Sequence, residues 1–124
     1  MNGQQLVERA EAAAVNAYAP YSNYNVGAVL LLKDGRVIEG VNVENAAYPL
    51  GVCAERTAIS KAASEGVRPG DLDAVAITAS PCGGCRQWLH EWKVERVWFR
   101  REDGSVAEYA PAGALLPDTW NLPE

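Results

Sequence analysis

Two short stretches of this sequence, Gly51-Val52-Cys53-Ala54-Glu55-Arg56 and Pro81-Cys82-Gly83-Gly84-Cys85-Arg86, decide how the chain is expected to fold. They contain all three cysteines of the protein, and each stretch is predicted to open a helix. The positive end of a helix favours the thiolate over the thiol, so the three sulfur atoms are suited to binding a cation. The fold must therefore bring two helix N-termini, their thiols and a carboxylate together.

The cysteines have the number and spacing of a catalytic zinc site. Thiolates are soft ligands that suit zinc, and three protein ligands leave the fourth tetrahedral position open for water. Cys82 and Cys85 can bind one ion from a single helical turn, whereas the fold must deliver Cys53. The alternatives are a structural zinc site, a Cys-x-x-Cys redox pair and unrelated core thiols. A structural site would need a fourth ligand, and the only histidine, His90, lies five residues beyond Cys85. We therefore predict one catalytic Zn²⁺ per chain.

Glu55 lies two residues after Cys53, close enough to face the ion without binding it. A carboxylate there can carry protons to and from a water molecule at the metal. The helix dipole alone would explain an isolated glutamate in a first turn, but the Cys-x-Glu spacing favours a catalytic role. Three thiolates around Zn²⁺ give a formal charge of 2 − 3 = −1. Arg56 is predicted to support the site by offsetting this charge, and Arg86 is a second candidate for that role.

Composition restricts the possible partners. The 124 residues fit one domain, for which about 100–200 residues are usual, and we expect a single domain spanning 1–124. Lys and Arg total 11 against 16 Asp and Glu, a net charge of −5, which argues against a nucleic-acid partner. The odd number of cysteines, all with proposed roles as thiolates, indicates a reducing compartment. The sequence shows no basic leader and no apolar run of membrane-spanning length, so we expect a soluble cytoplasmic protein with no membrane partner.

The order of predicted elements favours an α/β fold. Helices are expected at 4–18, 53–65 and 82–91, strands at 26–33, 36–43, 73–78, 94–100 and 105–109, and a last short helix at 112–116. Tight turns at Asp34-Gly35 and Asp103-Gly104 predict that the strands they join pair antiparallel. This order implies a mixed five-stranded sheet with helices on both faces. The second strand ends in Asn42-Val43-Glu44, where the period of two puts Asn42 and Glu44 on one face, as a possible clamp for a sugar hydroxyl.

The two cysteine-bearing stretches closely resemble the zinc signatures of the cytidine deaminase family in its three-cysteine form. Residues 21–28 and 40–51 are similar to that family's nucleoside-binding segments, so the resemblance runs in order from 18 to 87. It implies the same three-layer α/β/α sandwich and a zinc-dependent hydrolase of pyrimidine salvage. The implied reaction converts cytidine and deoxycytidine to uridine and deoxyuridine and releases ammonia. The resemblance also implies a homotetramer whose subunits share their active sites.

The resemblance assigns six residues to substrate binding: Asn42, Glu44, Tyr24, Ala54, Tyr48 and Trp120. The first two would bind the ribose 3′-hydroxyl. Tyr24 occupies a position where the family usually carries a phenylalanine near the base, and Trp120 falls where a late phenylalanine from a neighbouring subunit is expected. Tyr48 resembles a residue that reaches a neighbouring subunit's site, although a buried structural tyrosine is an alternative. Only residues 78–80 connect a strand to the second cysteine motif, a shorter link than in many family members.

Other functions stay open at this point. The chain could deaminate a free base or another aminopyrimidine, which activity on cytosine but not on cytidine would indicate. It could also be a structural zinc or nucleoside-binding module, which would retain the ion without turnover. A nucleic-acid editor is disfavoured by the net charge of −5. The sequence does not decide between cytidine and deoxycytidine as the preferred substrate.

Overall fold

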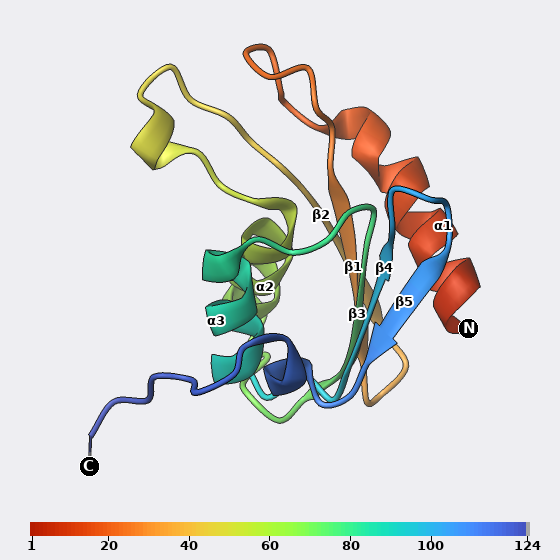
Figure 1. Ribbon diagram of the computed structural model, residues 1–124, viewed down its shortest axis with the longest axis vertical. Helices are drawn as coiled ribbons and strands as arrows, with labels where there is room; N and C mark the ends of the chain where they lie inside the picture. The colour runs from red at the N-terminus through yellow and green to blue at the C-terminus, as the bar shows by residue number, and fades with distance from the viewer. Residues whose placement is uncertain (124) are drawn as a thin grey trace.

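A five-stranded mixed sheet forms the centre of the protein (Figure 1), which is described by a computed structural model over residues 1–123. Its strands are β1 (Gly27–Leu32), β2 (Val37–Val41), β3 (Leu72–Ile77), β4 (Arg96–Arg100) and β5 (Val106–Tyr109). They lie in the order β2-β1-β3-β4-β5. The β3–β4 pair is parallel and the other neighbouring pairs are antiparallel, so the predicted mixed sheet and both predicted hairpins are confirmed.

Helices cover both faces of the sheet, as predicted (Figure 1). Helix α1 (Gly3–Ala13) packs on one face, while α2 (Ala54–Ser64) and α3 (Gly83–Glu91) pack on the other. Successive side chains of a strand point to opposite faces, so β1 supplies Val29 to the α1 side and Leu30 to the α2 side. Both side chains are fully buried, which explains why this strand is apolar without interruption. The architecture is the expected three-layer α/β/α sandwich.

Two glycines of the β1–β2 hairpin allow the helices to approach the sheet closely. A Cβ at Gly27 would lie 2.0 Å from the carbonyl oxygen of Ala10 in α1. A Cβ at Gly40 would lie 2.5 Å from the backbone nitrogen of Ala58 in α2. Since neither backbone atom can move aside cheaply, only glycine fits at these positions. The hairpin is thereby held between α1 and the helix that begins at Cys53.

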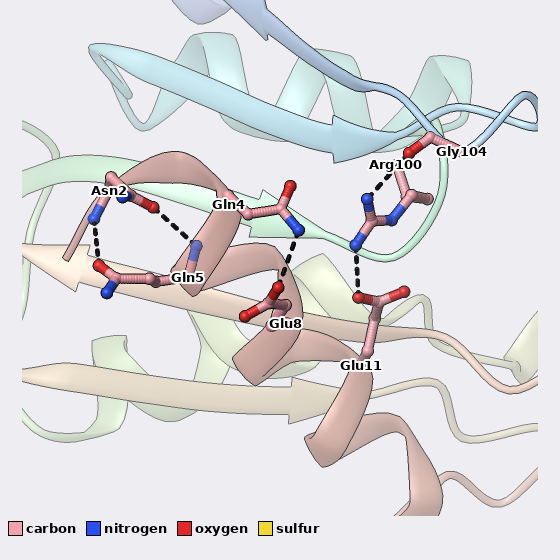
Figure 2. Close-up of polar contacts among 7 residues, drawn as sticks. All are labelled: Asn2, Gln4, Gln5, Glu8, Glu11, Arg100 and Gly104. Carbon is pink, nitrogen blue, oxygen red and sulfur yellow. Dashed lines mark hydrogen bonds and ion pairs between the residues drawn. The ribbon is translucent and has the colours of Figure 1, made fainter.

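Helix α1 is fixed by polar contacts at its two ends (Figure 2). The Asn2 side chain accepts a hydrogen bond from the Gln5 backbone N–H at 2.8 Å, and the Gln5 side chain accepts one from the Asn2 N–H at 3.0 Å. This capping box is typical of a stable helix start. Arg100 donates to Glu11 at 2.8 Å and to the Gly104 carbonyl at 2.9 Å, which ties α1 to the β4–β5 turn. The helix is shorter than the predicted 4–18, because a 3-10 turn, Ala14–Asn16, replaces its last residues.

The loops that follow α1 and β2 project from the same end of the molecule (Figure 1). The second loop contains a 3-10 turn, Tyr48–Leu50, and leads into α2.

Cys53 and Cys82 are the N-cap residues of α2 and α3, so each helix begins one residue later than predicted. Pro81 precedes the second N-cap and does not occupy the first helical turn. A last 3-10 turn, Ala112–Leu115, leads into the C-terminal tail. Within residues 1–123, no helix is both long and apolar enough to cross a bilayer.

Candidate metal centre

The three cysteines meet at the starts of α2 and α3. Cys53 and Cys82 are the N-caps of the two helices, and Cys85 lies in the first turn of α3. All three Sγ atoms lie within 4.8 Å of one another, and the Cys53–Cys82 pair is 3.9 Å apart. Tetrahedral zinc with Zn–S bonds of about 2.3 Å requires sulfur atoms about 3.8 Å apart. The three sulfurs therefore fit one zinc ion, and all three cysteines are free of disulfides.

The local environment affects the three thiols differently. Burial raises the pKa of the Cys53 and Cys85 thiols. Burial also acts to raise the pKa of Cys82, but hydrogen bonds from the Cys85 backbone N–H and from the neighbouring thiols outweigh it and lower this pKa. The backbone bond from Cys85 nitrogen to Cys82 Sγ measures 3.5 Å. A coordinated divalent cation deprotonates its thiol ligands, so metal binding at this site releases protons.

Glu55 is buried beside the cysteines. Its side chain lies in the first turn of α2, and the residue is 3% exposed, the only buried charged residue in the part of the chain that the structure describes. Burial raises the pKa of its carboxyl, while interactions with Cys85 and Arg56 act in the opposite direction. A carboxyl group with a raised pKa is suited to taking up and returning protons. An isolated carboxylate is costly to bury, which supports a functional explanation for its position.

The Arg56 side chain lies beside the three cysteines, with its nearest sulfur on Cys82. Its Nη2 atom is 3.9 Å from Cys82 Sγ, and its Nε atom is buried without a hydrogen-bond partner. A Cβ at Gly84 would lie 2.1 Å from the same Nη2, so the guanidinium packs directly over the backbone of α3. This places a positive charge beside the three thiols, which is the arrangement that the predicted supporting role requires.

Arg86 and His90 form hydrogen bonds with residues other than the three cysteines. Arg86 donates to the carbonyls of Pro81 and Leu115, both at 2.9 Å, and to the Ser80 hydroxyl at 3.1 Å. It therefore braces the start of α3. The Nε2 atom of His90 is 2.9 Å from Asn121 Oδ1. Among residues 1–123 the metal-binding group consists of the three cysteines alone, without a fourth protein ligand.

A cleft of about 420 Å³ opens over this group. Cys53, Cys82 and Glu55 line its floor, and five of the six predicted substrate-binding residues line the rest: Asn42, Glu44, Tyr24, Ala54 and Tyr48. The wall of the cleft also includes apolar residues, among them Val26 and Ile77. Their role was not predicted, because apolar residues at these positions are typical of any buried strand. Ala79 and Ser80 belong to the short link before Pro81 and also line the cleft.

Asn42 and Glu44 hold the loop of residues 21–26 in place. Asn42 Oδ1 accepts from the Val26 N–H at 2.8 Å, and Asn42 Nδ2 donates to the Tyr24 carbonyl at 2.9 Å. Glu44 Oε1 accepts from the N–H groups of Tyr21 and Ser22 at 3.0 and 3.1 Å. The Ser22 hydroxyl donates to Glu44 Oε2. The sequence pattern predicted a shared face for Asn42 and Glu44 but not these loop contacts.

The three aromatic residues predicted to contact substrate are exposed. Tyr24, Tyr48 and Trp120 are 60%, 74% and 64% exposed, which rules out the alternative of a buried structural Tyr48. The Tyr48 ring packs edge-on against Tyr21, with centroids 6.1 Å apart. Trp120 does not line the cleft of its own chain. It lies on the C-terminal tail, which extends away from the sheet (Figure 1), and its carbonyl accepts from Gln87 Nε2 at 3.3 Å.

Three thiols and a buried carboxylate at two helix starts of a mixed α/β/α sandwich suit a catalytic zinc site. Residues 1–101 match the family described as "Cytidine and deoxycytidylate deaminase zinc-binding region", and the chain belongs to this family. The family match and the three-cysteine group confirm the predicted zinc cofactor.

Relatives of known name cover almost the whole chain. A cytidine deaminase from Halalkalibacterium halodurans is 52% identical over 97% of this chain and 95% of its own length. One from Sporosarcina psychrophila is 45% identical over 98% and 93%. The crystal structure of cytidine deaminase from Burkholderia pseudomallei superposes with a TM-score of 0.89 at 44% identity, covering 97% of this chain and all of that one.

Proposed function

We propose that this protein is a zinc-dependent cytidine deaminase that hydrolyses cytidine and deoxycytidine to uridine and deoxyuridine and releases ammonia. The observation that carries the proposal is the burial of Glu55 in the same cleft as three Sγ atoms that lie within 4.8 Å of one another. The cleft, about 420 Å³, falls in the range of about 300–1,000 Å³ that is usual for small-molecule sites. The named relatives support the same reaction. The reaction belongs to pyrimidine salvage.

Glu55 is the proton carrier of the proposed mechanism. Cys53, Cys82 and Cys85 would hold the zinc ion, which would supply Lewis-acid activation of a water molecule. The hydrolysis adds a water oxygen to C4 of the pyrimidine and breaks the bond from C4 to the amino nitrogen. Glu55 takes both protons of the water in turn, giving one to ring nitrogen N3 and one to the departing amine. The products are the uracil nucleoside and ammonia, so all atoms are accounted for.

Asn42 and Glu44 form the proposed clamp for the ribose 3′-hydroxyl. After the loop contacts, the Asn42 amide retains one N–H, and the Glu44 carboxylate, with three bonds accepted, retains acceptor capacity. A hydroxyl can donate to the carboxylate and accept from the amide at the same time. The hydrogen-bonding groups that Asn42 and Glu44 have left thus suit a sugar hydroxyl, which favours a nucleoside over a free base as the substrate. Ala54 and Tyr24 are proposed to contact the pyrimidine.

The proposed assembly is a homotetramer of single-domain subunits, each spanning 1–124, in the cytoplasm. Trp120 supports shared sites, since its indole is 64% exposed and has no contact with the cleft of its own chain. Exposed tryptophan is favoured where a ligand or a partner covers it. We propose that Trp120 reaches the cleft of a neighbouring subunit, and that Tyr48 does so in addition to lining the cleft of its own chain.

Ammonia release from cytidine, deoxycytidine and cytosine tests the proposed function. We expect release from both nucleosides and little from the free base, with one zinc per chain by metal analysis. Activity on cytosine alone would favour a base deaminase. Zinc binding and cytidine binding without any ammonia would favour a binding module.

A further inference from the structure

Ser22 contacts two groups that line the cleft. Its hydroxyl donates a hydrogen bond to Glu44 Oε2, and its backbone N–H donates to Glu44 Oε1 at 3.1 Å. The same Oγ atom accepts a hydrogen bond from the backbone N–H of Tyr24 at 3.0 Å. A hydroxyl has one proton and two lone pairs, so it can make both contacts at the same time. Ser22 therefore connects the sugar-binding carboxylate with the aromatic residue of the rim.

Ser22 lies behind the cleft wall. Glu44 and Tyr24 line the cleft over the cysteines, whereas Ser22 lines a neighbouring hollow of about 410 Å³ that shares Glu44 and Tyr48 with it. A ligand on the cysteine side of Glu44 meets the carboxylate and not the serine. Any effect of Ser22 on such a ligand must pass through Glu44 or Tyr24.

The Ser22 hydroxyl controls the direction of the Glu44 carboxylate. Two backbone N–H groups, from Tyr21 and Ser22, bind Oε1, but among residues 1–123 only the Ser22 hydroxyl is bonded to Oε2. The terminal torsion of a glutamate is soft and turns both oxygens together, so the bond to Oε2 adds a second restraint on the plane of the carboxylate. The bond from the Ser22 side chain is also the main cause of the lowered pKa of the Glu44 carboxyl. The carboxylate is thereby held by hydrogen bonds to both of its oxygens.

We infer that Ser22 is a positioning residue for sugar recognition, which orients the Glu44 carboxylate toward the ribose 3′-hydroxyl and couples it to Tyr24. The inference rests on the proposed function, since it takes a nucleoside as the ligand. It adds a residue that touches no substrate atom and still sets the discrimination between sugars. Its action is specific to the 3′-hydroxyl, because that is the group that Glu44 and Asn42 are proposed to bind.

Cytidine and 3′-deoxycytidine together test this role. Ser22→Ala removes the hydroxyl and keeps both backbone bonds to Glu44. We expect the KM for cytidine to rise about tenfold with kcat little changed, and the preference in kcat/KM for cytidine over 3′-deoxycytidine to fall by a similar factor. Ser22→Thr retains a hydroxyl and should restore the preference.

Ser105 provides a matched control. Its hydroxyl donates to Asp103 Oδ1 at 2.6 Å in the β4–β5 turn, so Ser105→Ala removes a comparable serine–carboxylate bond outside the cleft. That variant should leave the kinetics of both substrates unchanged.

The outcomes separate this inference from the function on which it rests. A wild-type protein that releases no ammonia from cytidine would overturn the proposed function itself. If the wild type is active, an unchanged sugar preference in Ser22→Ala would overturn the role of Ser22 alone. Equal wild-type activity on cytidine and 3′-deoxycytidine would also overturn it. If Ser22→Ala lowers the zinc content and the melting temperature together with activity, the role of Ser22 is structural, and the inference is contradicted.

Discussion

The floor and the rim of the cleft are built in opposite ways. On the floor, Glu55 is 3% exposed and Cys53 is half-buried, and both lie at the start of α2. Cys82 is exposed, but it is the N-cap residue of α3, so its position is fixed by a helix packed against the sheet. On the rim, Tyr24 and Tyr48 are 60% and 74% exposed and belong to loops. Chemistry at the metal requires fixed positions, whereas recognition can use groups that a ligand or a neighbouring subunit covers. Substitutions on the floor should therefore change zinc content or kcat, and those on the rim should change KM.

The largest effect is expected from Cys53→Ala, Cys82→Ala and Cys85→Ala. Each removes one of three ligands and should abolish tight zinc binding and deamination. The melting temperature should also fall, because the ion ties the starts of α2 and α3 together and its binding free energy contributes to folding. Metal analysis and thermal unfolding check this. A full zinc equivalent in any of the three variants, at unchanged melting temperature, would refute the assignment of the ligands.

Glu55→Gln should leave the floor intact and stop the proton transfers. We expect kcat to fall by at least ~10²–10⁴-fold, the usual contribution of general acid–base catalysis. Zinc content and melting temperature should stay near wild type, since glutamine has the same shape. Glu65→Gln, at the exposed far end of α2, makes the same charge change as a control. Wild-type turnover in Glu55→Gln would exclude the proposed mechanism.

Arg56 and Arg86 offer a comparison between charge and structure at the same helix starts. Arg56→Gln removes the guanidinium 3.9 Å from Cys82 Sγ and should lower activity or zinc affinity about 10–100-fold. Arg86→Gln instead removes hydrogen bonds to Pro81, Leu115 and Ser80, so its main effect should be a lower melting temperature. Steady-state kinetics, zinc titration and thermal unfolding separate the two. Identical losses of activity in both variants would contradict the distinct role of Arg56.

The smallest effect is expected at Trp120. If its indole closes a neighbour's cleft, Trp120→Ala should raise the KM for cytidine about threefold to tenfold and leave the zinc content unchanged. Leu122→Ala, which alters another exposed apolar residue of the tail, should have no such effect. Sedimentation at assay concentration provides a second check. A fully active monomer would refute shared sites, and lost stability with unchanged KM would indicate packing within one chain.

The floor could be predicted from the sequence, because its chemistry depends on residue type at short spacing. Cys-x-Glu and Cys-x-x-Cys each lie within one helical turn, and helix start signals place both turns at N-termini. The remaining requirement, delivery of Cys53 to the other two cysteines, depends on the fold and was implied by the resemblance alone. The structure bears this out with Sγ atoms within 4.8 Å.

The rim could be predicted only in part. The strand period placed Asn42 and Glu44 on one face, but it gave no sign that Ser22, Tyr21 and Val26 would bond to them. Such loop contacts depend on tertiary geometry, for which a sequence period carries no information. The same limit applies to Arg86. It directly follows a cysteine, as Arg56 lies close to one, but its hydrogen-bond partners are Leu115 of the last 3-10 turn and residues 80–81 before α3.

Removal and return of zinc tests whether deamination requires one zinc ion held by the three cysteines. The protein is stripped of metal with a chelator, and zinc is then added back stepwise while bound metal and ammonia release from cytidine are measured on the same samples. Activity should be lost with the ion and should return in proportion to bound zinc, up to one equivalent per chain. Full activity in the stripped protein, or one equivalent of bound zinc with no ammonia release, would contradict this requirement.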